Sequence, residues 1–341
     1  MTPRPLASLA LACAAIAGAS AALAQAPAGT PAAATSEVRA WLLRIHSAAS
    51  RRNFQGIFVV SSGGSVASAR ISHFAEGPNQ YERIESLDGR QRKVFRHNDV
   101  VHTVWPASHV AMIEQRGLLS SFPALLQAGD DGLAEWYELH LEGVDRVAGH
   151  EADVLVVKPR DSYRYGYRLW ADRASGLLLR ADVIGERGET LETSSFSEVS
   201  IGVRPQSESV VQAMRKLDGY RVVKPQLTPT RLADEGWTVR QLVPGFKLVS
   251  SVSRQMETFG EPAADPAPPP VTQTIYSDGL TYVSIFIERF RPERHTHPML
   301  AALGATLTLT QRQGDWWVTV VGDTPAVTLK AFVAALERKK P

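Results

Sequence analysis

Cysteine is almost absent from this 341-residue chain, and its scarcity sets the first constraint on the protein. The single cysteine, Cys13, lies in an apolar run near the N-terminus. If that run is removed, the remaining chain has neither a disulfide nor a thiol, so burial of apolar side chains must hold it together. A cysteine nucleophile and a C-x-x-C redox motif are excluded as well.

Long apolar runs are also missing beyond the N-terminus, so we expect no membrane-spanning helix there. Residues 1 to 24 resemble a signal peptide, because Arg4 precedes an alanine-rich apolar run that ends in the small residues Ala22 and Ala24. We expect cleavage after Ala24, export, and a flexible leader over residues 25 to 35. A lipoprotein signal at Cys13 stays open as an alternative, although Ala10 fits its apolar requirement poorly.

Charge of a single sign and catalytic motifs are lacking too. The 37 basic and 35 acidic residues nearly cancel, and no basic stripe interleaved with aromatic residues argues for a nucleic-acid partner. The sequence contains no G-x-S-x-G elbow, no P-loop and no H-E-x-x-H motif. We therefore expect neither enzyme activity nor a cofactor.

Histidines give no metal site that local spacing supports. His295 and His297, close to Glu293, form the only tight cluster, and a structural site would need a third and a fourth ligand. A solvated loop is the favoured interpretation of this cluster. Three further histidines are predicted at half-exposed strand positions: His97, His102 and His109.

The residues that are present predict a mainly antiparallel β protein of class α+β. Ser36 can cap a helix whose apolar residues, among them Trp41, Leu42 and Ile45, recur at helical spacing. From Phe54 the periodicity changes to two, in short runs separated by turn residues, which predicts a meander up to about Gly202. The first domain is thus expected over residues 36 to 202.

A second, smaller α+β domain is predicted after a connection. Residues 203 to 232 hold three prolines and no sustained periodicity, which indicates a linker, although VVQAMRKL within it can form two turns of helix. Residues 233 to 341 contain further short strands and a final helix from Thr324 to about Arg338. Two interruptions are expected: a short helix or loop at residues 120 to 129, and a proline-rich loop at residues 261 to 270, which cannot lie inside a sheet.

The stretch QYERIESLDGRQRKVFRHND, residues 80 to 99, combines a hairpin signal with dense charge. Asp88-Gly89 predicts a two-residue type I′ turn, which requires positive φ at both positions. The charges are mixed in sign, as on a solvated sheet face, whereas a phosphate-binding patch would carry one sign. We expect an outer sheet surface here, with inward contact from a few apolar residues: Tyr81, Ile84 and Val94 or Phe95.

The aromatic stretch DSYRYGYRLW is the most distinctive run of the first domain. Period two places Tyr163, Tyr165 and Tyr167 on one face of a strand, and Arg164 and Arg168 on the other. The favoured interpretation packs the tyrosines on the core and covers the outer side with arginine stems. The alternative is a wall that contacts a peptide or a lipid, since tyrosine offers apolar area and arginine can meet a carboxylate or a phosphate.

Adjacent tryptophans raise a similar question in the second domain. Neighbouring strand residues point to opposite faces, so one of Trp316 and Trp317 is expected in the core and the other at the domain interface or in solvent.

Several of these runs together resemble the MucB/RseB family. NFQGIFVV, RISHF, the charged stretch at residues 80 to 99 and YRYGYRLWAD are similar to its amino-terminal domain. LVPGFKLVSS, IYSDGLTYVSIFIE and LGATLTLTQRQGDWWVTVVGDTP are similar to its carboxy-terminal domain, in the same order. The resemblance covers nearly the whole chain after the signal peptide.

The resemblance implies a fold and a function that the periodicity alone does not give. It implies an open half-barrel similar to the lipoprotein carriers LolA and LolB, with a smaller domain beside it. It also implies a periplasmic protein that binds the periplasmic region of a membrane-spanning anti-sigma factor and shields it from proteolysis. A lipid, lipopolysaccharide or mislocalised lipoprotein is the implied releasing signal, and self-association stays open.

A periplasmic lipid or lipoprotein carrier is the alternative function, since a half-barrel alone does not fix what the protein does. Partner or lipid contact is expected from a small set of aromatic and basic residues: Trp41, Tyr163, Arg164, Tyr165, Tyr167, Arg168 and Trp316.

Overall fold

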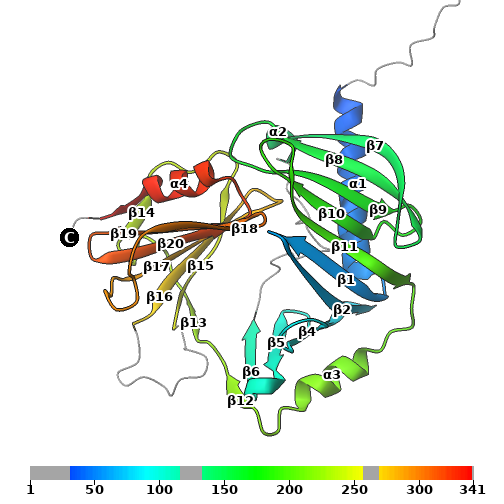
Figure 1. Ribbon diagram of the computed structural model, residues 1–341, viewed down its shortest axis with the longest axis horizontal. Coiled ribbons are helices and arrows are strands. Elements are labelled where there is room, and N and C mark those ends of the chain that lie inside the picture. Colours follow the sequence, from blue (N-terminus) through cyan, green and yellow to red (C-terminus); the bar gives the residue numbers. More distant parts are fainter. Residues whose placement is uncertain (1–30, 116–132, 256–268, 340–341) are drawn as a thin grey trace, which may run out of the picture.

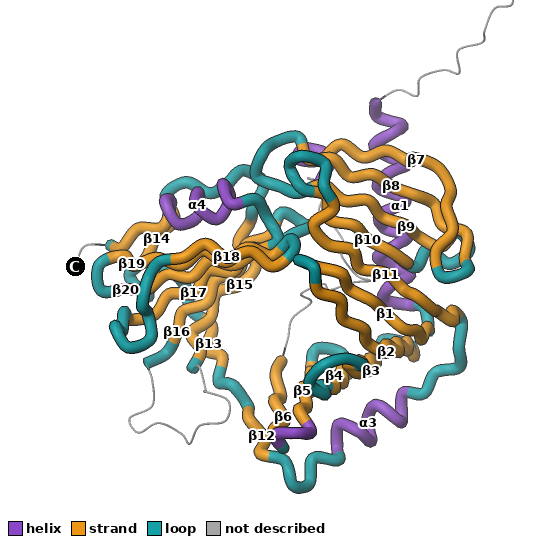
Figure 2. The backbone as a smooth tube through the Cα atoms, viewed as in Figure 1, coloured by secondary structure: helices purple, strands orange, loops and turns teal. Residues whose placement is uncertain are grey.

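The protein contains two large β-sheets that lie beside each other, with helix α1 (Pro31–Arg51) against the first and helix α4 (Ala326–Ala335) against the second (Figure 1). The computed structural model describes residues 31–115, 133–255 and 269–339, with side chains from residue 40 onward. The expected interruption at residues 120 to 129 and most of the proline-rich stretch at 261 to 270 lie outside these residues. The tube view in Figure 2 shows that strands dominate the described chain.

The first sheet has 12 strands in the order β12-β6-β5-β4-β3-β2-β1-β11-β10-β9-β8-β7. Apart from the parallel pair β12 and β6, neighbouring strands are antiparallel. Its edges, β12 and β7, do not pair with each other, so the sheet is open, and the predicted antiparallel half-barrel is confirmed. The strands are β1 Phe54–Ser62, β2 Ser65–Glu76, β3 Asn79–Ser86, β4 Lys93–His97, β5 Val100–Trp105, β6 Val110–Gln115, β7 Tyr137–Val147, β8 His150–Pro159, β9 Gly166–Asp172, β10 Leu178–Ile184, β11 Thr190–Ile201 and β12 Arg221–Val223.

Helix α1, Pro31–Arg51, covers one face of this sheet. It begins five residues before the expected cap at Ser36, so part of the expected flexible leader is helical. Trp41 and Ile45 of its apolar stripe are buried, as the helical spacing predicted. Burying two side chains of this size contributes about 1.5–3 kcal/mol each, which fixes the helix against the strands. Below, the first half means the first sheet with the helices that pack on it, and the second half means the second sheet with its helix. Two very short helical elements complete the first half: η1 Pro106–Ser108 and α2 Leu133–Trp136.

The segment expected to be a linker contains a helix that packs on the first sheet and two strands, of which one joins each sheet. Helix α3, Ser207–Arg215, packs on the face of the first sheet opposite α1, where fully buried Val210 joins the cluster of Phe74 and Phe95. Strand β12 then pairs with β6, and β13, Leu227–Pro229, joins the second sheet. Regular elements therefore occupy much of the expected linker, and only a few residues separate β12 from β13. The exact domain limits stay predictions.

The second sheet has seven strands in the order β13-β15-β16-β17-β20-β19-β18. Helix α4, Ala326–Ala335, covers one face, where Phe332 and Leu329 are fully buried above Ile285 and Val318. The helix ends three residues before the expected Arg338, because the chain becomes extended at Leu336 and pairs with β14. The remaining strands are β14 Trp237–Val239, β15 Lys247–Arg254, β16 Val271–Ser277, β17 Tyr282–Arg289, β18 Met299–Leu303, β19 Thr306–Gln313, β20 Trp316–Gly322 and β21 Leu336–Arg338.

The charged stretch at residues 80 to 99 forms a hairpin with a longer turn than expected. The two-residue turn was wrong: β3 and β4 are joined by six residues, Ser86 N donates to Arg92 O, and only Gly89 of the Asp-Gly pair has positive φ. Asp88 instead accepts from the backbone N–H and hydroxyl of Ser68, which removes it from the turn geometry. The charges pair as on a mixed-sign surface: Lys93–Glu85 and Arg96–Glu82 join β4 to β3, and Arg83–Glu85 lies along β3 itself.

Candidate functional site

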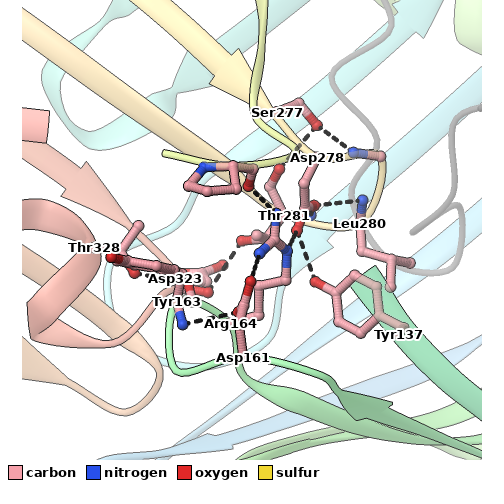
Figure 3. A network of polar contacts seen from close by, with 12 residues as sticks. Tyr137, Asp161, Tyr163, Arg164, Ser277, Asp278, Leu280, Thr281, Asp323 and Thr328 are labelled. Atoms are coloured by element: carbon pink, nitrogen blue, oxygen red, sulfur yellow. Dashed lines mark hydrogen bonds and ion pairs between the residues drawn. The ribbon is translucent and has the colours of Figure 1, made fainter. Parts of the chain in front are cut away.

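The two sheets meet where the turn between β16 and β17 reaches the loop that precedes β9. Figure 3 shows the polar contacts there, which join Tyr137, Asp161 and Arg164 of the first half to Asp278 of the second. Loop 160–165 exists because Asp161 accepts the N–H of Tyr163 at 3.0 Å and bends the chain before β9 begins. Side-chain hydrogen bonds and an ion pair therefore connect the two halves at this point.

Arg164 and Asp278 form an ion pair that is buried on both sides. The Arg164 Nε atom lies 2.8 Å from Asp278 Oδ2, and both side chains are fully shielded from solvent. Arg164 also donates to the Asp161 carboxylate and to the Pro244 carbonyl, and its guanidinium lies 4.8 Å from the ring centroid of Trp136. A planar guanidinium can meet several acceptors at once, which a lysine could not reproduce.

Both oxygens of the Asp278 carboxylate accept hydrogen bonds. Oδ1 accepts the N–H groups of Leu280 at 3.0 Å and Thr281 at 2.9 Å, as aspartate does in turns. Oδ2 accepts the Tyr137 hydroxyl at 2.8 Å as well as Arg164. Burial, and then the Asp278 charge, raise the pKa of Tyr137 well above its ordinary value, so the hydroxyl stays a donor. The desolvation of two buried charges is thereby offset by hydrogen bonds.

Each half also places a side chain in the apolar core of the other. Leu280, from the second half, is buried in the cluster of Trp41, Tyr137 and Tyr167. In the opposite direction Tyr163 packs against the core below α4, and its carbonyl accepts the Thr328 hydroxyl at 2.7 Å. The contact therefore combines apolar burial with a saturated ion pair.

A second contact between the halves borders a cleft of about 470 Å³. Its walls are the β1–β2 hairpin around Gly63, strand β11 near Glu192, and the end of β18 with Gly304. Burial raises the pKa of the Glu192 carboxyl; the hydrogen bond from Ser62 at 2.9 Å opposes this, and the Asp323 charge adds to it. Among the described residues that line this cleft, Glu192 is the only charged one.

A third feature is a basic cleft of about 390 Å³ at the end of α1, lined by Arg44, Arg51, Arg52 and Ser175 among others. Arg44 lies 3.9 Å from Asp153, so part of its charge is compensated. Basic residues in the last turn of a helix are also the ordinary complement of its dipole.

The residues predicted to contact a partner or a lipid lie in different environments: some are buried and others are exposed. Trp41, Tyr165 and Tyr167 are buried, and a partner could touch them only after rearrangement. Arg168 is exposed on β9 and pairs with Glu142, 2.5 Å away. Arg164 was predicted on an outer strand face, and this was wrong, because β9 begins only at Gly166. Whether any of them contacts a partner stays a prediction.

The tryptophan pair divides between the two faces of the second sheet. Trp317 is buried and stacks on His295, with ring centroids 4.9 Å apart. Trp316 is half-buried against Trp237 at 5.8 Å, with Arg338 over its ring, so it belongs to the core side below α4. Its predicted contact with a partner is untested.

The histidines differ from expectation in their burial. The solvated loop predicted for His295 was wrong, since this residue is only 7% exposed between Trp317 and Glu288. His102 is buried as well, below α3, and burial lowers its pKa. Across the described residues no group of three or more potential metal ligands comes together.

Sequence reasoning missed Tyr137, Asp278 and Leu280. Ser277-Asp278-Gly279 was noted only as a turn signal, and nothing local indicates that the aspartate has a partner 114 residues earlier. None of the described helices is long and apolar enough to cross a membrane.

Comparisons with known proteins agree over both halves. The chain matches the family profiles "MucB/RseB N-terminal domain" over residues 37–214 and "MucB/RseB C-terminal domain" over residues 231–337. The sigma factor AlgU regulatory protein MucB of Pseudomonas aeruginosa is 31% identical over 318 residues, which cover 90% of this chain and 92% of that protein. The sigma-E factor regulatory protein RseB of Escherichia coli (strain K12) is 26% identical over 88% of this chain and 90% of that protein.

Solved structures give the same result. A crystal structure of MucB in complex with MucA(peri) has a TM-score of 0.64 and 29% identity, and covers 89% of this chain and 99% of that one. The complex structure of Pseudomonas aeruginosa MucA/MucB has a TM-score of 0.67 and 28% identity, and covers 89% of this chain and 100% of that one. These relatives are named as regulatory proteins and not as enzymes.

Proposed function

The chain belongs to the MucB/RseB family, and we propose that it binds the periplasmic segment of a membrane-spanning anti-sigma factor and shields that segment from proteolysis. The observation that carries the proposal is that the similarity to MucB, solved with MucA(peri), spans both halves of the chain in order. We also propose that the protein is located in the periplasm and that it acts by binding its partner, without catalysing a reaction. The signal-like residues 1 to 24 support the location.

The two-half architecture gives this function a physical basis. A protease needs an extended, accessible substrate, and a surface formed by two sheets can hold such a segment and exclude the protease from it. A partner segment that is disordered alone must lose conformational entropy when it binds, so a large surface is needed to offset that cost. The contact built on Arg164 and Asp278 would keep the two halves in one arrangement while the segment is bound.

The test uses the chain from residue 25 onward and the periplasmic segment of the same organism's anti-sigma factor. Isothermal titration should show binding, and the protein should slow cleavage of the segment by the membrane protease that initiates its destruction. Absence of binding together with unchanged cleavage would refute the proposed function.

We further propose that an acyl-chain amphiphile, such as a lipopolysaccharide or a mislocalised lipoprotein, releases the partner. The support is that Leu280 of the second half lies in the same apolar cluster as Trp41 of α1. An acyl chain that enters beside α1 would compete with Leu280 and so favour a different arrangement of the halves. Shifting that equilibrium tenfold takes about 1.4 kcal/mol, which two buried methylenes can supply.

Purified lipopolysaccharide titrated into the preformed complex tests this proposal. Leu280→Ala should lower the concentration that releases the partner, while Leu248→Ala, at a residue 58% exposed on the same sheet, should leave it unchanged. Lipid that binds without releasing the partner at saturation would show that this cluster is not the switch.

A further inference from the structure

Strand β18 is an edge strand of unusual composition. It forms one end of the second sheet and pairs only with β19. Its sequence, MLAAL, has no charge and no proline, and Met299, Leu300 and Leu303 are 47%, 48% and 62% exposed. An exposed apolar edge is a template for pairing with another strand, and native proteins ordinarily protect such edges.

The free backbone groups of β18 can be identified from its register. Leu303 and Thr306 are paired across the two-residue turn at Gly304, so they exchange both hydrogen bonds with each other. Because the pattern alternates, Leu300 and Ala302 direct their N–H and C=O groups away from β19. Among the described residues, no hydrogen bond involves the backbone groups of Leu300 or Ala302 on that outer side.

The other edges of the two large sheets are protected. Strand β7 is interrupted by a bulge between Leu141 and Gly143 and carries several charged residues. Strands β12 and β13 are three residues long, and β13 ends in Pro229. Among the described edge strands of the two large sheets, only β18 is five residues long, apolar and without a bulge.

The outer side of β18 opens onto the cleft between the two halves. Ala302 and Gly304 line this space of about 470 Å³, and the β1–β2 hairpin at Gly63 and Gly64 lines it from the first half. The glycines there carry no side chain that would fill the cleft. The size is that of a site for a small ligand or a few residues of peptide, and the hairpin leaves little room for the whole sheet of a second copy.

We propose that β18 is a strand-addition site, at which an extended segment of the anti-sigma partner pairs with Leu300 and Ala302 and continues into the cleft. This inference rests on the proposed function and specifies where and how the partner binds. The segment would carry apolar residues that cover Leu300 and Leu303, and a basic residue opposite Glu192, the one charged side chain among the described residues that line the cleft. Backbone hydrogen bonds would supply affinity, and these side chains would supply specificity.

Ala302→Pro tests the proposal with little effect on the fold. Proline removes only the outward N–H of an edge strand, where proline is tolerated, and its ring blocks a neighbouring strand. The matched control Ala302→Val keeps the N–H and suits a strand. We expect the Pro variant to bind the periplasmic segment at least tenfold more weakly and the Val variant to bind within twofold of the wild type.

Hydrogen exchange by NMR gives a second measurement that does not depend on a variant. In the complex the amides of Leu300 and Ala302 should exchange more slowly than in the free protein, whereas the amides of exposed Leu248 and Val249 should not change. Binding by all three proteins without protection at Leu300 and Ala302 would overturn the inference and leave the proposed function standing. Failure of the wild type to bind at all would instead refute the proposed function.

A second copy of the chain is the competing occupant of this edge. Light scattering coupled to size exclusion distinguishes the two cases. A wild-type dimer that Ala302→Pro converts to a monomer, with partner affinity unchanged, would assign β18 to self-association and overturn the inference.

Discussion

Arg164→Met isolates the energy of the ion pair between the two halves. Methionine keeps part of the apolar stem of Arg164, but it removes the guanidinium that lies over Trp136 and leaves the Asp278 carboxylate buried without its cation. Removing one partner of a buried pair typically costs about 3–5 kcal/mol. Asp278 retains three donors, from Tyr137, Leu280 and Thr281, so we expect the lower end of that range. About 3 kcal/mol corresponds to a roughly 100-fold weaker contact between the halves.

Equilibrium unfolding in urea, followed by tryptophan fluorescence and by far-UV circular dichroism, measures this effect. In the wild type the two signals should change together, because the contact couples the halves. In the variant the transition should begin at lower urea, and the two signals should separate as each half unfolds on its own.

Arg168→Met is the matched control for this prediction. Arg168 lies four residues further along and pairs with Glu142, but its side chain is 45% exposed. Exposed pairs of this kind contribute about 0–1 kcal/mol, so its unfolding curve should nearly coincide with the wild-type curve. If both arginine variants unfold at the same urea concentration as the wild type, the buried pair does not couple the halves and the reasoning is wrong.

Two further predictions concern the same contacts. The folded-state pKa of Glu192 is raised above its ordinary value of 4.5, so its contribution to stability is present below that pH and is lost as pH rises through the raised pKa. Glu192→Gln should therefore be more stable than the wild type in thermal melts at pH 7, with the difference vanishing below pH 4.5; an equal difference at both pH values would contradict this. Gly245→Ala should destabilise the contact by about 1–3 kcal/mol, because φ there is +81° and a Cβ would lie 2.7 Å from the Trp136 ring. Gly314→Ala, with φ +60° and open space, is its control in the same urea assay, and equal losses would show that the clash is absorbed.

Much of the fold could be predicted because its signals are local. Period two in the short runs after Phe54 places alternate residues on alternate faces whatever their partners are, so the meander follows from the sequence. The stripe of Trp41 and Ile45 likewise fixes the buried face of α1. Strand β18 was missed because MLAAL does not alternate, and its pairing depends on β19 and the turn at Gly304. The helical start at Pro31 was missed because proline is tolerated in the first turn of a helix as well as in a leader.

The contact between the halves shows why the site was harder to predict than the fold. DSYRYGYRLW alternates well, so period two placed Arg164 on an outer face; yet Asp161 at its start is the residue type that bends a chain by accepting a nearby N–H, and it accepts that of Tyr163. Because β9 begins only at Gly166, the alternation of the residues before it does not predict which side chains are exposed, and Arg164 can turn inward. A buried arginine needs a carboxylate, and many acidic residues of the chain could have served. Asp278 is selected by the docking of two sheets, which no local pattern encodes, and an Asp-Gly turn signal is equally consistent with an aspartate that serves only its own turn.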